Sequence, residues 1–106
     1  MTTRSDAPVS PKELFVLAVL AGRPLHGYGL VKAVEARSEG AVVLDPTNLY
    51  RLLQRRVASG WIREVEQRGY SRRRTFEITH LGRAVLRAET QRLAELVRNL
   101  RRGKLL

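Results

Sequence analysis

The side chains that could carry chemistry in this chain are suited to holding an anion rather than to breaking a bond. The sequence contains no cysteine, so neither a disulfide scaffold nor a thiolate metal site is possible. His26 has no carboxylate or serine partner nearby, and no acid pair, metal cluster, nucleophile with a base or phosphate-binding glycine loop can be found. The sequence therefore argues against an enzyme and indicates no cofactor and no metal site.

Basic side chains are abundant and are concentrated in one half of the chain. The formal net charge is +10; residues 1–50 hold five basic and five acidic side chains, whereas residues 51–106 hold fifteen and five. A surface this polarised implies a polyanionic partner. A merely solvated face is the other interpretation. A basic amphipathic membrane binder fits less well, because the arginines cluster on a hairpin as well as on a helix.

A helix is predicted directly after Asp45, which can cap it, with Pro46 suited to its first turn and Ser59-Gly60 ending it. At about 100° per residue, Leu49 and Leu53 define its inward face, with Leu52 and Val57 on the flanks. The outward side chains are types that pair with base edges, as arginine does with guanine and asparagine or glutamine with adenine. They are Thr47, Asn48, Arg51, Gln54, Arg55 and Ala58.

Two residues of this helix do not fall clearly on either face. Tyr50 lies between the faces and could reach a phosphate or seal the edge of the core. Arg56 falls close to the inward face and is predicted to extend its charge from the helix end, with its stem buried. An ordinary solvated outer face stays open as the alternative to a base-reading one.

A hairpin with a basic tip is predicted next, with strands over Trp61–Val65 and Arg74–Ile78. Phe76 and Ile78 share parity and should face the core, where Trp61 should also pack. At the tip, Arg72, Arg73 and Arg74 repel one another unless an anion neutralises them, and such tips lie along phosphates or enter the minor groove. Residues 41–44 could form a further short strand that pairs with this hairpin.

The N-terminal part of the chain is expected to supply the central helix. Residues 1–9 are expected to be disordered. Ser10 to Glu13 form a capping box with Pro11 at the first helical position, and the apolar run Leu14–Ala21 predicts a mostly buried helix. This run is too short to span a membrane, and no signal peptide precedes it, so we expect a cytoplasmic protein.

The last predicted helix begins at Thr79, and its leucines repeat every seven residues. A helix of about twenty residues is near 30 Å long, more than this small domain can cover, so its apolar stripe needs a second chain. Packing back onto the first helix is the alternative. The residues expected at a dimer interface are Leu86, Leu93, Leu96, Val97 and Leu100.

Taken together, four segments resemble the PadR family of transcriptional regulators in their order and spacing. They are residues 25–30 (LHGYGL), 45–53 (DPTNLYRLL), 60–62 (GWI) and 72–79 (RRRTFEIT). The resemblance implies a winged helix-turn-helix, a C-terminal helix that forms a homodimer, and repression at palindromic promoter sites; some relatives release DNA on binding phenolic or aromatic compounds. The DNA-facing positions that it implies are the wing arginines and Tyr28, Thr47, Asn48, Tyr50, Arg51 and Gln54.

Two departures from the family pattern modify this expectation. Arg56 stands where the family commonly has an apolar residue, so the helix over residues 46–59 is expected to be slightly rotated, with Val57 filling in. The C-terminal helix has no aromatic residue, so the sequence indicates no particular effector.

The sequence thus predicts a mainly α fold with a small β-hairpin, a winged helix-turn-helix over residues 10–79 and a dimerisation helix over residues 80–106. The predicted function is a homodimeric repressor that binds double-stranded DNA. An RNA- or ribosome-associated winged helix and a protein-interaction module of the same fold stay open.

Overall fold

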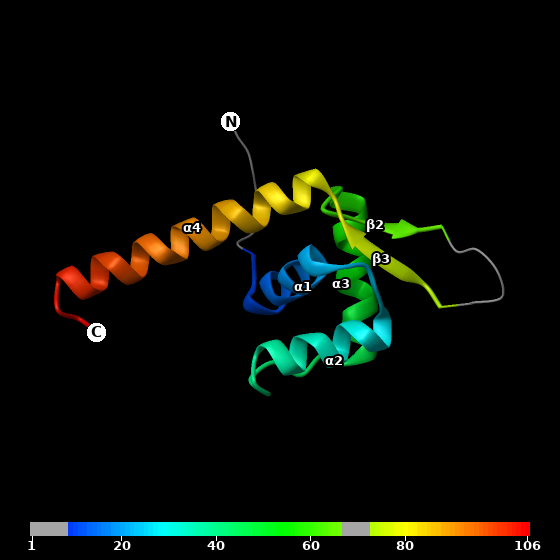
Figure 1. The fold of residues 1–106 in the computed structure, drawn as a ribbon, viewed down its shortest axis with the longest axis horizontal. Helices are drawn as coiled ribbons and strands as arrows, with labels where there is room; N and C mark the ends of the chain where they lie inside the picture. Colours follow the sequence, from blue (N-terminus) through cyan, green and yellow to red (C-terminus); the bar gives the residue numbers. More distant parts are fainter. Residues whose placement is uncertain (1–8, 67–72) are drawn as a thin grey trace.

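The computed structural model describes residues 9–66 and 73–106. The elements in chain order are α1 (Pro11–Gly22), β1 (Leu25–His26), α2 (Gly27–Arg37), α3 (Pro46–Ser59), β2 (Ile62–Val65), β3 (Thr75–Ile78) and α4 (His80–Arg102). Figure 1 shows α1 at the centre, α2 and α3 against it, the β2–β3 hairpin projecting on one side and α4 on the other. The predicted fold class is confirmed. The expected disordered segment, residues 1–9, lies outside the described residues except for Val9.

The helix boundaries follow the capping side chains that the sequence predicts. The Glu13 amide donates to Ser10 Oγ and the Ser10 amide to Glu13 Oε1, both at 3.2 Å, which completes the capping box. Asp45 accepts from the Asn48 amide at 3.1 Å at the start of α3, and Gly60, at φ 82°, ends that helix in the left-handed conformation. Thr79 caps α4 by accepting from the Gly82 amide at 3.0 Å.

The sheet has the order β1-β3-β2 and is antiparallel throughout. The strand expected at residues 41–44 is wrong: the third strand is Leu25–His26, in which Leu25 pairs with Phe76. The physical reason is that the Val42 amide donates to Ser38 Oγ at 2.9 Å, so it is committed to its own turn. Leu44 is buried without pairing in a sheet.

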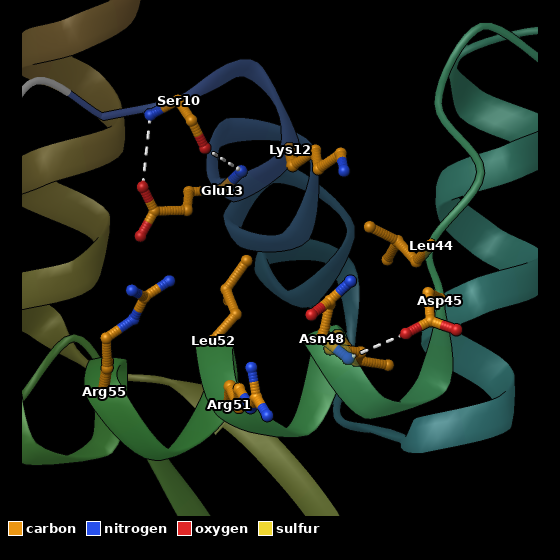
Figure 2. A pocket seen from close by; sticks show the side chains of 10 residues that line it. Ser10, Lys12, Glu13, Leu44, Asp45, Asn48, Arg51, Leu52 and Arg55 are labelled. Carbon is orange, nitrogen blue, oxygen red and sulfur yellow. Dashed lines mark hydrogen bonds between the residues drawn. The ribbon is translucent and has the colours of Figure 1, made fainter.

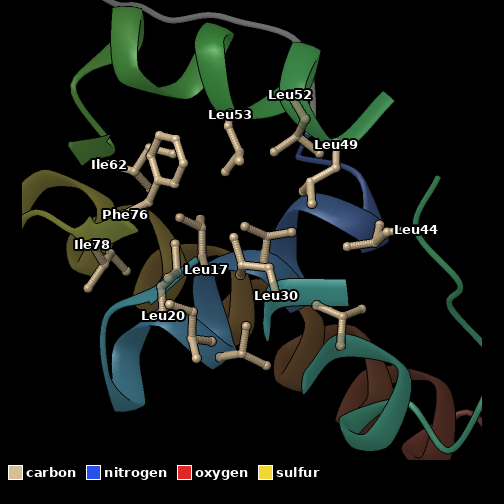
Figure 3. Packing of buried hydrophobic residues seen from close by; sticks show 14 residues of the cluster. Leu17, Leu20, Leu30, Leu44, Leu49, Leu52, Leu53, Ile62, Phe76 and Ile78 are labelled. Carbon is tan, nitrogen blue, oxygen red and sulfur yellow. The ribbon is translucent and has the colours of Figure 1, made fainter. Parts of the chain in front are cut away.

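The core lies between α1, α2, α3 and the inner face of the hairpin. In Figure 3, Leu49, Leu52 and Leu53 of α3 point toward Leu17 and Leu20 of α1, and the hairpin residues close one side. Phe76 and Ile78 are buried and Trp61 packs against the core, as predicted. These contacts fix which side of α3 faces outward.

The long helix α4 is anchored at its first half only. Val85 and Leu86 pack against the core, whereas Leu93, Leu96 and Val97 are 47%, 52% and 39% exposed. Packing of α4 back onto the same chain therefore accounts for Leu86 but leaves Leu93, Leu96 and Val97 exposed. In residues 9–66 and 73–106, no helix combines the length and the apolar character that crossing a membrane requires.

Candidate nucleic-acid interface

The outer face of α3 is polar and exposed. The side chains predicted to point outward are all exposed: Thr47, Asn48, Arg51, Gln54, Arg55 and Ala58. These side chains face outward because Leu49, Leu52 and Leu53 on the opposite side of the helix are buried in the core. The predicted orientation of α3 is confirmed, while DNA contact by these residues stays a prediction.

Tyr50 joins α3 to the start of α2. A Cβ on Gly27 would lie 2.8 Å from Tyr50 Oη, so the glycine leaves the space that the phenol ring occupies. Tyr50 itself is 37% exposed, so it seals the core edge and still presents part of its ring outside. Tyr28, next in α2, is 68% exposed, and Lys32 Nζ lies 5.7 Å from its ring centre, so its ring is open to a partner.

His26 has a structural role that the sequence did not reveal. Its Nδ1 accepts from the Gly29 amide at 3.1 Å and caps α2, while its Nε2 lies 3.1 Å from Arg73 Nη1. The imidazole therefore connects the start of α2 with the wing. The histidine cap could have been suspected from its position before Gly27, but the contact with Arg73 joins residues far apart in the sequence.

The base of the wing is held by an ion pair between its two strands. Arg74 donates from Nε to Glu64 Oε2 at 3.1 Å and from Nη2 to Glu64 Oε1 at 2.9 Å. Its Cζ also lies 5.8 Å from the Tyr50 ring centre and 5.4 Å from that of Phe76. The hydrogen bond to Arg74 lowers the pKa of the Glu64 carboxyl, and the same bond raises the pKa of the Arg74 guanidinium.

This ion pair changes what is expected of the three tip arginines. Arg74 finds its neutralising carboxylate within the chain, at Glu64, rather than needing an external anion. Arg73 is exposed and contacts His26. Arg72 lies outside the described residues. Arg73 and Arg74 are therefore not equivalent charges, because Arg74 is paired with a carboxylate and Arg73 contacts an imidazole.

Arg56 does not extend its charge from the helix end, so that prediction is wrong. Its Nε lies 2.7 Å from Glu13 Oε2, its Cζ lies 4.3 Å from the Trp61 ring centre, and its side chain is only 20% exposed. The charge stays inside because α1 supplies a carboxylate and Trp61 supplies an aromatic face. The expected filling of this place by Val57 is also wrong, since Val57 is 41% exposed.

The arrangement is that of a winged helix-turn-helix: α2 and α3 at an angle, an exposed α3, and a hairpin beside it. The chain belongs to the transcriptional regulator PadR-like family, whose sequence model matches residues 16–88. Members of this family are transcriptional regulators and not enzymes, which confirms the prediction from the missing catalytic groups.

Relatives and solved structures agree with this assignment. A stretch of 84 residues is 38% identical to an uncharacterised 37.1 kDa protein in transposon TN4556 of Streptomyces fradiae, and it makes up 79% of this chain but only 23% of that protein. The structure is similar to a PadR family transcription regulator from Clostridium difficile, at a TM-score of 0.74 and 16% identity, over 89% of this chain and 98% of that one.

Two further solved structures share the fold. A transcriptional regulator from Clostridium thermocellum matches at a TM-score of 0.71 and 22% identity, with 87% of each chain covered. Wild-type MarR from E. coli matches at a TM-score of 0.65 and 20% identity, over 78% of this chain and 56% of MarR. The winged-helix fold predicted from the sequence is thereby confirmed.

Proposed function

We propose that this chain is a homodimeric repressor that binds a palindromic site in double-stranded DNA. The observation that carries the proposal is the outer face of α3, where five side chains able to contact bases or phosphates stand exposed beside a basic hairpin. The residues of α3 proposed to contact the DNA are Thr47, Asn48, Arg51, Gln54 and Arg55. Such a protein would act in the cytoplasm, where it meets the DNA.

The shape of α3 favours DNA over RNA as the partner. A helix with its side chains is about 10–12 Å across, and the major groove of B-DNA is about 12 Å wide. The major groove of duplex RNA is deep and too narrow for side chains to read. An exposed helix whose outer face carries amide and guanidinium groups therefore matches a DNA groove.

The residues around α3 are proposed to hold the backbone. Tyr28 is exposed at the start of α2, and Arg73 is exposed where it contacts His26, the residue that caps α2. Arg72, which lies outside the described residues, is proposed to join them. Arg74 would have to exchange Glu64 for a phosphate, so we assign it mainly to holding the wing against Tyr50.

Dimerisation is proposed through α4. The exposed apolar side chains of its second half continue into a groove between α1 and α4 that is lined by Phe15, Leu86 and Leu93, among others. A second copy of α4 would cover both and place two recognition helices in two-fold symmetry, which is what a palindromic site requires. The proposed interface residues are Leu86, Leu93, Leu96, Val97 and Leu100; any effector is unidentified.

Arg51 and Arg73 test the division between reading and anchoring. Arg51→Ala should weaken binding to the preferred duplex by about 1–3 kcal/mol and relax the preference at one base pair, because arginine pairs with guanine through two hydrogen bonds. Arg73→Ala should weaken binding to all duplexes alike and reduce the slope of log affinity against log salt by about one ion. Fluorescence anisotropy across a salt series measures both quantities.

The two variants serve as each other's control, since both remove one arginine. If Arg51→Ala and Arg73→Ala changed the preference and the salt slope in the same way, the assignment of α3 to bases and of the wing to phosphates would be wrong.

Leu93 tests the dimer. Leu93→Glu should yield monomers, because it places a charge in the middle of the apolar stripe of α4. Light scattering measures the mass directly. Gln91→Glu is the matched control, since Gln91 is exposed and lies on another side of the helix. An unchanged dimer mass for Leu93→Glu would refute the assignment of this stripe to the interface.

A further inference from the structure

Recognition helix α3 has a hollow on each of its two flanks. The flank toward the wing is hollowed between Tyr50 and Gln54 of α3 and Glu64 and Arg74 of the hairpin. The opposite flank carries a hollow of about 280 Å³ between α3 and the N-terminal end of α1. We call the second one the α1–α3 hollow; its lining residues are Ser10, Lys12, Glu13, Leu44, Asp45, Asn48, Leu49, Arg51, Leu52 and Arg55.

Three cationic side chains surround the α1–α3 hollow. In Figure 2, Lys12 comes from α1, while Arg51 and Arg55 come from α3. All three are exposed, and within residues 9–66 and 73–106 none of their side chains forms an ion pair or a hydrogen bond. Arg56, Arg63, Arg74 and Arg92, in contrast, each pair with a carboxylate.

The two carboxylates at the α1–α3 hollow are already engaged. Glu13 accepts from the Ser10 amide through Oε1 and pairs with Arg56 through Oε2, and Figure 2 shows the first of these bonds. Asp45 accepts from the Asn48 amide. Because Arg56 pairs with Glu13, three cations at the hollow face one carboxylate, Asp45, that has no cationic partner among the described residues, and an excess of positive charge remains.

Lys12 occupies a position that does not favour a lysine. It is the second residue of α1, where the positive end of the helix dipole disfavours a cation. An anion in the hollow would offset this cost, since it would be attracted by the ammonium group and by the helix end together.

The position of the hollow fits one strand of the DNA backbone. A helix that lies in the major groove has a phosphate backbone on each side of it. The wing stands on the side of α3 that carries Tyr50 and Gln54, and the α1–α3 hollow on the side that carries Asn48 and Arg55. The backbone opposite the wing would therefore pass over the hollow.

We propose that the α1–α3 hollow binds a backbone phosphate of the DNA, with Lys12 and Arg55 as its ligands. The inference rests on the proposed function and extends the DNA footprint from α2, α3 and the wing to α1. It divides the basic residues of α3 between two tasks: Arg51 reads a base, while Arg55 holds the backbone.

The lysines allow a direct footprint, because Lys12, Lys32 and Lys104 are the only three in the chain. The full chain, alone and bound to a duplex selected from random DNA, is treated with an amine-acetylating reagent, and each lysine is followed by mass spectrometry. Lys12 should lose its reactivity in the complex. Lys104, beyond the end of α4, should react equally in both states and is the internal control.

A second measurement separates phosphate contact from simple covering. Lys12→Gln should reduce the slope of log affinity against log salt by about 0.9, the value for one phosphate, whereas Lys104→Gln should leave it unchanged. The thermal midpoint of Lys12→Gln should not fall below that of the wild type, because Lys12 is exposed, makes no ion pair within the described residues and stands at the positive end of the α1 dipole.

Each outcome decides the proposal. Protection of Lys12 together with the smaller slope supports the phosphate site. Equal reactivity of Lys12 in both states, or an unchanged slope for Lys12→Gln, overturns the phosphate site. The proposed function still stands in that case, because the chain binds the selected duplex. If the wild-type chain selected no duplex at all, both proposals would fall together.

Discussion

Gly82→Ala is expected to lower the free energy of unfolding by about 3 kcal/mol, the upper end of the usual cost of overpacking. A Cβ at this position would lie 2.1 Å from the carbonyl oxygen of Trp61 and 2.8 Å from Ile78 Cγ1. The first of these atoms belongs to the backbone and also accepts from the Thr79 amide and hydroxyl, both at 3.0 Å. It therefore cannot give way as the end of a flexible side chain would.

The consequence reaches beyond stability, because Gly82 lies where the first turn of α4 meets the base of the hairpin. To admit a methyl group, α4 must move away from Trp61, and α4 carries the proposed dimer interface. Urea unfolding at fixed protein concentration measures the effect, since the stability of a dimer depends on concentration.

Gly22→Ala is the matched control for this experiment. Gly22 is the last residue of α1, and a Cβ there would meet nothing within 4 Å. The substitution should stabilise the protein slightly, by about 0.4–1 kcal/mol, because alanine restricts the unfolded chain more than glycine does. An unfolding free energy for Gly82→Ala as high as that of Gly22→Ala would contradict the close packing of α4 on the hairpin.

Glu13→Gln is expected to cost about 3 kcal/mol, at the low end for breaking a buried ion pair, because Arg56 keeps some access to solvent. The glutamine can still accept from the Ser10 amide, so the capping box survives and the change isolates the ion pair. The substitution leaves the guanidinium of Arg56 without its counter-charge, and the Arg56 side chain is only 20% exposed to solvent.

A double-mutant cycle measures the coupling between the two residues. Arg56→Met in the Glu13→Gln background should restore most of the stability, since it removes the uncompensated charge and leaves an apolar side chain on Trp61. Trp61 is the only tryptophan, and the Arg56 guanidinium lies over its ring, so its fluorescence reports on the same junction. Additive costs of the two substitutions would show that Glu13 and Arg56 do not depend on each other.

The parts of the fold that the sequence predicted well are those that local chemistry decides. The caps at Ser10, Asp45 and Thr79 each act on an amide three residues later, and the faces of α3 follow from the spacing of Leu49 and Leu53. These interactions are complete within one helical turn. A single sequence therefore contains all the information that they need.

The parts that were wrong or missed depend on partners far away in the chain. Residues 25–26 form a strand only because Phe76 lies opposite, and Arg56 stays inside only because Glu13 faces it. The capping box accounts for one oxygen of Glu13, and the partner of the second oxygen, Arg56, lies far along the chain. The requirement for glycine at position 82 likewise arises from Trp61 and Ile78, which only the folded chain brings there.

The candidate site shows the same division. The outward residues of α3 were identified by periodicity alone, and the structure exposes all of them. The difference between Arg73 and Arg74 could not be foreseen, because it depends on the cross-strand pairing that sets Glu64 beside Arg74. The α1–α3 hollow combines Lys12 with α3 and was not visible in either segment by itself.

The central claim is that α3 reads double-stranded DNA, and a competition experiment tests it most directly. A labelled duplex selected by the full chain from random DNA is displaced by the same duplex without label, by an unrelated duplex and by a folded RNA of equal length. We expect the selected duplex to compete at concentrations at least about 10³-fold lower than the unrelated duplex, the usual gap between specific and non-specific binding, and the RNA to compete no better than the unrelated duplex. Displacement by the RNA at concentrations below those of the selected duplex would contradict the claim.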